Sequence, residues 1–303
     1  MRSAALASAV QGSASPGRQA GENTFDFTCV SLPSIQPILK MAPALSGKSI
    51  VIIGGTTGLG LSAAEAFVRD GARVVLIGRN PENVQAARKN LGADAAAFAA
   101  DAADPQTAQR AIELAMNQFG GCHGLYHVAG GSGRRLGDGP LHELTDEGWR
   151  ATIDLNLSSL IFSNRAAVRH FLASKMGGSI LNMSSVLGWS PSPEHFATHA
   201  YAAAKSAVIG FTKSIAAYYA RHNVRCNVIA PALVHTPMAE RAANNSAIKD
   251  FIKHKQPLDG GRIGQPEDLD AAAVYFMSDA SKFTTGQVLA VDGGWCVSEG
   301  APR

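Results

Sequence analysis

The sequence predicts an α/β fold in which a doubly wound parallel sheet lies between two layers of helices. Three observations support this: short apolar runs typical of buried strands alternate with longer helix-like runs, a glycine-rich turn follows the first apolar run, and no internal repeat is visible. Repeated strand-helix units form parallel sheets covered on both faces. With 303 residues and 46% apolar composition, the chain can bury a substantial core.

The first 45 residues differ in composition from the rest. They are rich in Ala, Ser, Gly and Pro, show no sustained periodicity and contain no acidic residue before Glu22. This predicts an N-terminal extension over 1–45 that is either disordered or an organellar targeting segment, although an upstream start before Met41 would look the same. We expect a single folded domain over 46–303.

Charge and hydropathy exclude two classes of partner. The formal net charge is only +3 and no basic stripe with interleaved aromatic residues occurs, so we expect no nucleic acid. No apolar run is long enough to form a membrane-spanning helix, so we expect no membrane partner. The four cysteines are scattered without a C-x-x-C pair, which favours a reducing compartment such as the cytoplasm.

A metal site has one local candidate. His195 and His199 are four residues apart, a spacing that would bring two imidazoles together on a helix. No glutamate follows His195 and no third ligand is evident. We therefore interpret both as loop histidines and expect no metal.

The first predicted strand, 49–53, leads into the motif Gly54-Gly-Thr-Thr-Gly-Leu-Gly60 and then a helix over 61–70. Strand, glycine turn and helix in this order form the dinucleotide fingerprint of a Rossmann fold, because the glycines allow close backbone approach and the helix N-terminus receives the pyrophosphate. The cofactor-binding residues expected in this motif are Gly54, Thr56, Thr57, Gly58, Leu59 and Gly60.

The second strand, 73–77, ends at Gly78-Arg79. A dinucleotide site commonly carries an acid here that binds the ribose hydroxyls of NAD, whereas Arg79 suits the 2′-phosphate of NADP. We expect NADP(H) to be favoured and NAD(H) to remain possible.

The alternation continues with helix 81–91, strand 95–100, helix 105–119 and strand 124–128. Asp101, with Ala102 after it, follows a strand end, where ligands gather in such sheets. Asp101 therefore either contacts the adenine or caps the following turn.

The glycine-rich segment 129–140 suits a mobile wall of a pocket. Within it, Arg134 and Arg135 either bind an anionic substrate or are solvated, the commoner state of surface arginines.

A helix begins at Thr145 and carries Asn156. Because asparagine is a poor helix former, we expect Asn156 to have a polar partner.

Tyr201 and Lys205 are the centre of the predicted chemistry. After a strand over 179–183 and the pair Ser184-Ser185, a long helix follows Tyr201 to about Arg221 and places Lys205 on the same face. A neighbouring ammonium favours phenolate, so we expect a lowered Tyr201 pKa that suits proton transfer. Strands over 225–229 and 288–291 complete the sheet.

Over nearly all of residues 47–295 the chain resembles the short-chain dehydrogenase/reductase family, in its single-domain branch. The matching landmarks are Gly54 to Gly60, Asp101, Ala129-Gly130, Asn156, Ser185, Tyr201-x-x-x-Lys205, Asn227 to Pro231 with Thr236, Arg262-x-Gly264-x-Pro266-Glu267-Asp268, and Val291-Asp292-Gly293-Gly294.

The resemblance implies a catalytic tetrad. Ser185 would polarise a carbonyl, Tyr201 would exchange its proton, Lys205 would lower the tyrosine pKa while binding the nicotinamide ribose, and Asn156 would position a relay water. It also implies a homotetramer. Further cofactor contacts are expected at Ala129, Gly130, Pro231, Val234 and Thr236.

Several positions depart from the family pattern. Ile53 replaces a threonine and His127-Val128 replaces paired asparagines, so two hydrogen bonds that support the cofactor loop must be absent or replaced. Ala232 replaces a glycine. The segment from Ser185 to Tyr201 is a few residues longer than usual, which predicts a reshaped substrate pocket.

The function predicted first is an NAD(P)H-dependent oxidoreductase that interconverts a ketone and a secondary alcohol, with Tyr201 as general acid and base. One alternative is a 3-oxoacyl-thioester reductase, suggested by Lys249, Lys253 and Lys255, although periodic lysines usually mark a solvated helix face. Another is a non-catalytic dinucleotide sensor. The substrate is expected to be selected by segments 131–140, 187–199 and 233–256.

Overall fold

The computed structural model describes residues 42–300. The predicted extension over 1–45 therefore lies almost entirely outside the described residues. Within the described part, no helix has both the length and the apolar character needed to cross a bilayer.

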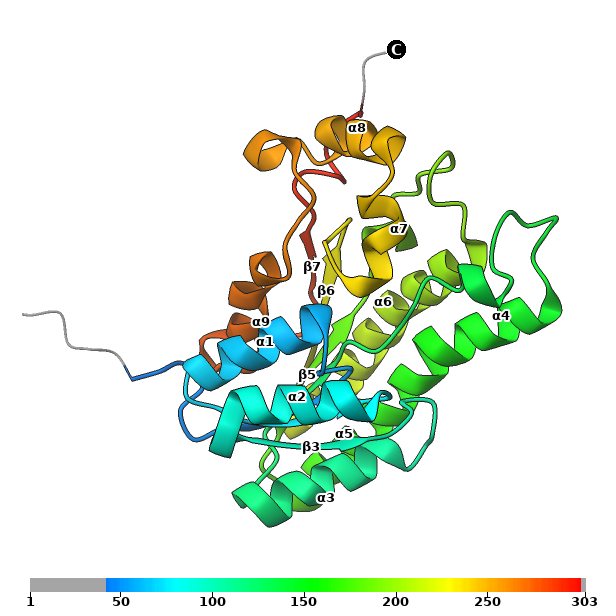
Figure 1. Ribbon diagram of the computed structural model, residues 1–303. Helices are drawn as coiled ribbons and strands as arrows, with labels where there is room; N and C mark the ends of the chain where they lie inside the picture. The colour runs from blue at the N-terminus through cyan, green and yellow to red at the C-terminus, as the bar shows by residue number, and fades with distance from the viewer. Residues whose placement is uncertain (1–41, 301–303) are drawn as a thin grey trace, which may run out of the picture. The chain divides into compact units, whose positions relative to one another are not determined.

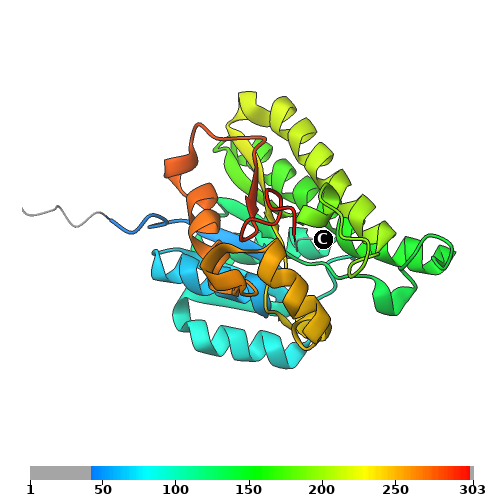
Figure 2. The ribbon, with the colours of Figure 1, turned by 90° about the horizontal axis from the view of Figure 1, so that it is seen from above.

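Seven parallel strands form one sheet in the order β3-β2-β1-β4-β5-β6-β7. This order reverses direction between β1 and β4, as in a doubly wound fold, and confirms the predicted fold class. Figures 1 and 2 show the sheet in the middle of the domain with helices on both sides. The strands are β1 (Ser49–Ile53), β2 (Arg73–Gly78), β3 (Ala95–Ala99), β4 (Gly124–His127), β5 (Gly178–Met183), β6 (Val224–Pro231) and β7 (Val288–Val291).

The helices pack on the sheet through two separate apolar clusters. Alternate side chains of β1 enter different clusters, Ile50 and Ile52 facing α1 and α9, Val51 and Ile53 facing α3 and α5. This alternation is what a strand covered on both faces requires. The helices are α1 (Gly58–Arg69), α2 (Pro81–Leu91), α3 (Thr107–Phe119), α4 (Asp146–Ile153), α5 (Ser159–Ser174), α6 (His199–Tyr219), α7 (Glu240–Ala243), α8 (Ser246–Lys255) and α9 (Asp270–Met277).

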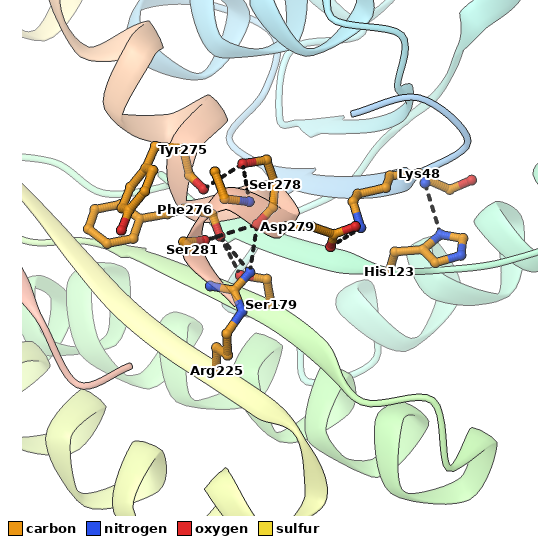
Figure 3. A network of polar contacts seen from close by, with 11 residues as sticks. Lys48, His123, Ser179, Arg225, Tyr275, Phe276, Ser278, Asp279 and Ser281 are labelled. Carbon is orange, nitrogen blue, oxygen red and sulfur yellow. Dashed lines mark hydrogen bonds and ion pairs between the residues drawn. The ribbon is translucent and has the colours of Figure 1, made fainter. Parts of the chain in front are cut away.

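A polar network closes the amino-terminal edge of the sheet (Figure 3). Arg225, at the start of β6, donates to the carbonyl oxygens of Phe276 and Ser278 at 2.9 and 3.3 Å. At the start of β1, Lys48 pairs with Asp279 at 2.7 Å. These contacts attach the end of α9 to the strands, so this edge has a structural role and the opposite, carboxyl-terminal edge is left for ligands.

Candidate active site

A cavity of about 340 Å³ lies at the carboxyl-terminal edge of the sheet. Parallel sheets of this kind bind ligands there, because loops diverge where the strand order reverses. All the predicted cofactor residues except Gly60 line it, and Ser185 also lines it. Asn156 lies behind the wall.

The glycine motif packs too closely for side chains. Gly54 has φ +87°, and a Cβ there would lie 2.6 Å from the backbone nitrogen of Ala129. A Cβ on Gly60 would lie 2.0 Å from the carbonyl oxygen of Gly54. Gly60 therefore lets α1 approach the turn, although it does not touch the cavity.

The N-terminus of α1 is open to an anion. Thr57 occupies its N-cap position, but its side chain makes no capping hydrogen bond, and the first turn contains no acid. The first amide groups of a helix need acceptors and carry partial positive charge. Thr57, Gly58 and Leu59 line the cavity at this point, so the structure fits the diphosphate of a nicotinamide dinucleotide.

At the far end of the cavity, Arg79 is exposed and lies in the wall beside Thr56 and Gly78. The Asp101 carboxylate accepts a hydrogen bond from Ala103 N at 2.9 Å, so it caps the following turn, as one interpretation of the sequence expected. Its contact with adenine stays a prediction.

Backbone groups hold the loop where the usual side chains are missing. The amides of Val128 and Ala129 both donate to the carbonyl of Ile53, at 2.8 and 2.9 Å. The His127 ring turns away and contacts the hydroxyls of Ser163 and Ser159 on α5. Burial, aided by the charge of Lys205, lowers its pKa to about 3, so the ring is neutral.

The two serines after β5 have different roles. The Ser184 hydroxyl donates to the carbonyl of Lys205 at 2.7 Å and so attaches the strand to α6. Ser185, only 6% exposed, lines the cavity, and its hydroxyl accepts a hydrogen bond from Leu187 N at 3.2 Å and donates to the carbonyl of Pro231 at 3.5 Å. Both serines line the cavity, but the Ser184 hydroxyl is engaged by the backbone; the catalytic role of Ser185 stays a prediction.

Lys205 is buried, with its ammonium 5.5 Å from the centre of the Tyr201 ring. It donates to the carbonyl of Met183 at 3.0 Å. Burial lowers the pKa of Lys205 to about 8. Tyr201 and Lys205 lie on one face of α6, as the spacing predicted.

The expected lowering of the Tyr201 pKa is wrong for this structure. Burial of the hydroxyl raises the pKa to about 12, and the hydrogen bond with Ser185 offsets only part of this effect. The physical reason is that removing the phenolate from water raises the pKa more than the positive charge of Lys205 lowers it. The ammonium lies over the ring and donates its hydrogen bond to the carbonyl of Met183.

Asn156 has the polar partners that its mid-helix position predicted. Its amide nitrogen donates to the carbonyls of Gly131 and Thr152, both at 2.9 Å, and its oxygen accepts from Gly131 N at 3.0 Å. The side chain thus donates to the carbonyl of Thr152, which in an α-helix would accept the backbone amide of Asn156. Residues Asp154–Ser158 form a π-helical turn instead.

The comparisons with known proteins agree on one family. Residues 54–296 match a family model described as enoyl-(acyl carrier protein) reductase. The chain is 34% identical over 252 residues to 2,5-dichloro-2,5-cyclohexadiene-1,4-diol dehydrogenase of Sphingobium indicum, covering 83% of this chain and 98% of that protein. It is 36% identical over 263 residues to 3beta-hydroxysteroid dehydrogenase 1 of Eggerthella lenta, covering 84% and 96%.

A solved structure of a short-chain type dehydrogenase/reductase from Mycobacterium ulcerans matches with a TM-score of 0.77 at 30% identity, covering 84% of this chain and 92% of that one. The chain belongs to the short-chain dehydrogenase/reductase family. It is an oxidoreductase that interconverts alcohols and ketones with a nicotinamide dinucleotide.

In this short-chain dehydrogenase/reductase, the three segments expected to select the substrate all reach the cavity. They contribute Arg134, Phe196 and Arg241, among others. Trp295 also lines the cavity, and the sequence did not predict this position. It follows β7, is 1% exposed and packs edge-to-face on Phe196 with ring centroids 5.9 Å apart. A tryptophan beyond the last strand has no local signal that places it in the site.

The two histidines considered as metal ligands lie in different surroundings. His195 packs against Phe251, with ring centroids 4.9 Å apart, and His199 is the first residue of α6. Across residues 42–300, no group of three or more His, Cys, Asp or Glu side chains could hold a metal ion.

The lysines that suggested an acyl-thioester site lie on or at the end of α8, and none of them lines the cavity.

Asp138 is a second residue that sequence reasoning missed. The residue is 4% exposed, and its carboxylate accepts hydrogen bonds from Ala200 N at 3.0 Å and Tyr201 N at 2.9 Å. It therefore caps the helix that carries Tyr201 and Lys205, because the local N-cap residue Thr198 makes no side-chain capping bond.

Replacement of Asp138 by alanine should lower both stability and turnover. Two buried amides of the first α6 turn lose their acceptor, which costs about 1 to 2 kcal/mol, and the backbone at Tyr201 is no longer held. Thermal unfolding and kcat measure the two effects. Asp146→Ala, which removes an exposed acid from the first turn of α4, is the control, and equal losses in both variants would contradict the role of Asp138.

Proposed function

We propose that this enzyme is an NADPH-preferring ketoreductase in which Ser185, Tyr201, Lys205 and Asn156 carry the chemistry. The supporting observation is that Ser185, Tyr201 and Lys205 line the same cavity as the open N-terminus of α1. A dinucleotide anchored at α1 would thus extend toward a proton donor. When bound, the nicotinamide supplies or accepts the hydride.

Ser185 and Tyr201 act together at the substrate oxygen. Ser185 and Tyr201 each direct a hydroxyl at the carbonyl oxygen, which polarises the bond. Because burial raises the Tyr201 pKa to about 12, the phenol is protonated at neutral pH and can give its proton to the developing alkoxide. This state favours carbonyl reduction over alcohol oxidation.

Lys205 and Asn156 support the donor. The Lys205 ammonium, at 3.3 Å from the position of a Cβ on Gly130, reaches the wall where the nicotinamide ribose is expected. Asn156 holds Gly131 through two hydrogen bonds and fixes this wall. Ala129, Gly130, Pro231, Val234 and Thr236 would complete the nicotinamide end. By family resemblance the enzyme would be a homotetramer, which sedimentation velocity can test.

A screen that measures oxidation of NADPH and NADH by carbonyl compounds tests the function. NADPH and NADH consumption should be followed with ketones, diketones, sugars and 3-oxoacyl-thioesters. We expect turnover of at least one free ketone, with NADPH preferred. Turnover of thioesters alone would favour the acyl-thioester alternative. Tight NADPH binding without turnover of any carbonyl would favour a sensor.

The NADPH preference depends on Arg79. Arg79→Ala should weaken NADPH binding about ten- to a hundredfold and leave NADH binding nearly unchanged, because a charge-assisted contact contributes about 1.5 to 3 kcal/mol. Fluorescence titration with both cofactors measures the change. Arg88→Ala, on the exposed last turn of α2, should change neither. Equal losses of NADPH and NADH affinity in Arg79→Ala would show that Arg79 does not bind the 2′-phosphate.

A further inference from the structure

Two arginines lie where two cavities meet. A second cavity, of about 430 Å³, is lined by residues of the loop before α6 and of the start of α8. It shares Arg134 and Arg241 with the cavity that contains Tyr201. Figure 1 shows α7, which carries Arg241, above the carboxyl-terminal ends of the strands. Any substrate that extends outward from Tyr201 in this direction meets both side chains.

The two guanidinium groups come from separate segments and repel each other. Arg134 lies in the loop between β4 and α4 and is half-buried, whereas Arg241 is exposed. Burial, and next the positive charge of Arg241, lowers the pKa of Arg134, while Asp138 raises it. The fold therefore holds two cations close together at an energetic cost.

Neither Arg134 nor Arg241 forms an ion pair within residues 42–300, although Glu194 also lines the second cavity. The nearby Asp138 carboxylate accepts the amides of Ala200 and Tyr201. One guanidinium nitrogen of Arg134 donates to the carbonyl of His195 at 3.1 Å, which orients the group. An arginine has five N–H donors, so most of the donors of this pair remain for a ligand.

We propose that Arg134 and Arg241 form an anion subsite that binds a carboxylate or phosphate group of the substrate. Guanidinium forks match both groups. The proposal rests on the proposed function, since the substrate carbonyl would lie at Ser185 and Tyr201. Phe196 and Trp295 line the same cavity and would contact the apolar part between the two ends. Arg135 lines neither cavity, so it does not belong to the subsite.

Binding of matched pairs of ketones tests the subsite. One pair is levulinate and methyl levulinate, with longer homologues, and the other is dihydroxyacetone phosphate and dihydroxyacetone. Calorimetry on the protein saturated with oxidised cofactor measures binding without turnover. We expect the anionic member of one pair to bind about tenfold or more tightly than its neutral counterpart. The pair that shows this preference identifies the group as carboxylate or phosphate.

Variants separate charge recognition from structure. Arg241→Gln should reduce the preference about tenfold without weakening binding of the neutral ketone, because its side chain makes no hydrogen bond within the described residues. Arg134→Lys should retain part of the preference, and Arg135→Gln should retain all of it. A preference that survives in Arg241→Gln, or its absence from every pair in the wild-type protein, would overturn the subsite. If the preference is found but no ketone is reduced, the subsite stands and the ketoreductase proposal fails.

Discussion

Tyr201→Phe should lower kcat for carbonyl reduction about 10²- to 10⁴-fold while folding and NADPH binding stay nearly unchanged. Phenylalanine keeps the ring that packs beside Lys205 but cannot give a proton to the developing alkoxide, and general acid catalysis is typically worth this factor. Steady-state kinetics and cofactor titration measure the two quantities. In the wild-type enzyme, kcat for reduction should persist through neutral pH, because the raised pKa of Tyr201 keeps the phenol protonated.

The control for this prediction lies on the same helix. Tyr218 is 59% exposed on α6, and Tyr218→Phe removes an equivalent hydroxyl away from the cavity. It should retain wild-type kcat. Near-normal carbonyl reduction by Tyr201→Phe would show that another group donates the proton.

Lys205→Met should abolish most activity and yet make the protein more stable. Burial lowers the pKa of Lys205 from 10.5 to about 8, which means that the folded state disfavours the charged form by about 3 kcal/mol. Methionine fills similar space without a charge, but it leaves the carbonyl of Met183 without its donor, at a cost of about 1 to 2 kcal/mol. We expect a net gain of about 1 to 2 kcal/mol at pH 7.

The pH dependence gives the sign of this effect. Between about pH 8 and 10.5 the unfolded chain binds more protons at Lys205 than the folded chain does, so wild-type stability should rise with pH across this window. In Lys205→Met this contribution should disappear. Urea unfolding at several pH values measures it, and Lys213→Met, at an exposed α6 position, is the control. A variant that is less stable than wild type at pH 7 would contradict the cost assigned to the buried ammonium.

Activity and cofactor binding should fall together in Lys205→Met. The ammonium reaches the wall beside Gly130, so its removal should weaken NADPH binding about tenfold as well as lowering kcat. Tyr201→Phe should lower kcat alone. This difference separates a proton donor from a residue that also binds the cofactor.

The chain's local patterns were sufficient for the fold and for the ends of the cavity. The order of strands and helices predicted the parallel sheet, because buried strands and amphipathic helices differ in period and length. The spacing between Tyr201 and Lys205 placed both on one face of α6, and the glycine motif placed a turn before α1. Each of these inferences depends on residues within about one turn or one strand of each other.

Tertiary structure alone decided the contacts between distant segments and the electrostatics of buried groups. Asp138 caps a helix that begins about 60 residues later, Trp295 reaches the site from beyond the last strand, and Arg134 lines the same cavity as Arg241 of α7. Lys205 next to Tyr201 suggested a lowered tyrosine pKa, but burial raises it. Desolvation depends on how completely the surrounding segments exclude water, and no spacing of residues along the chain encodes that quantity.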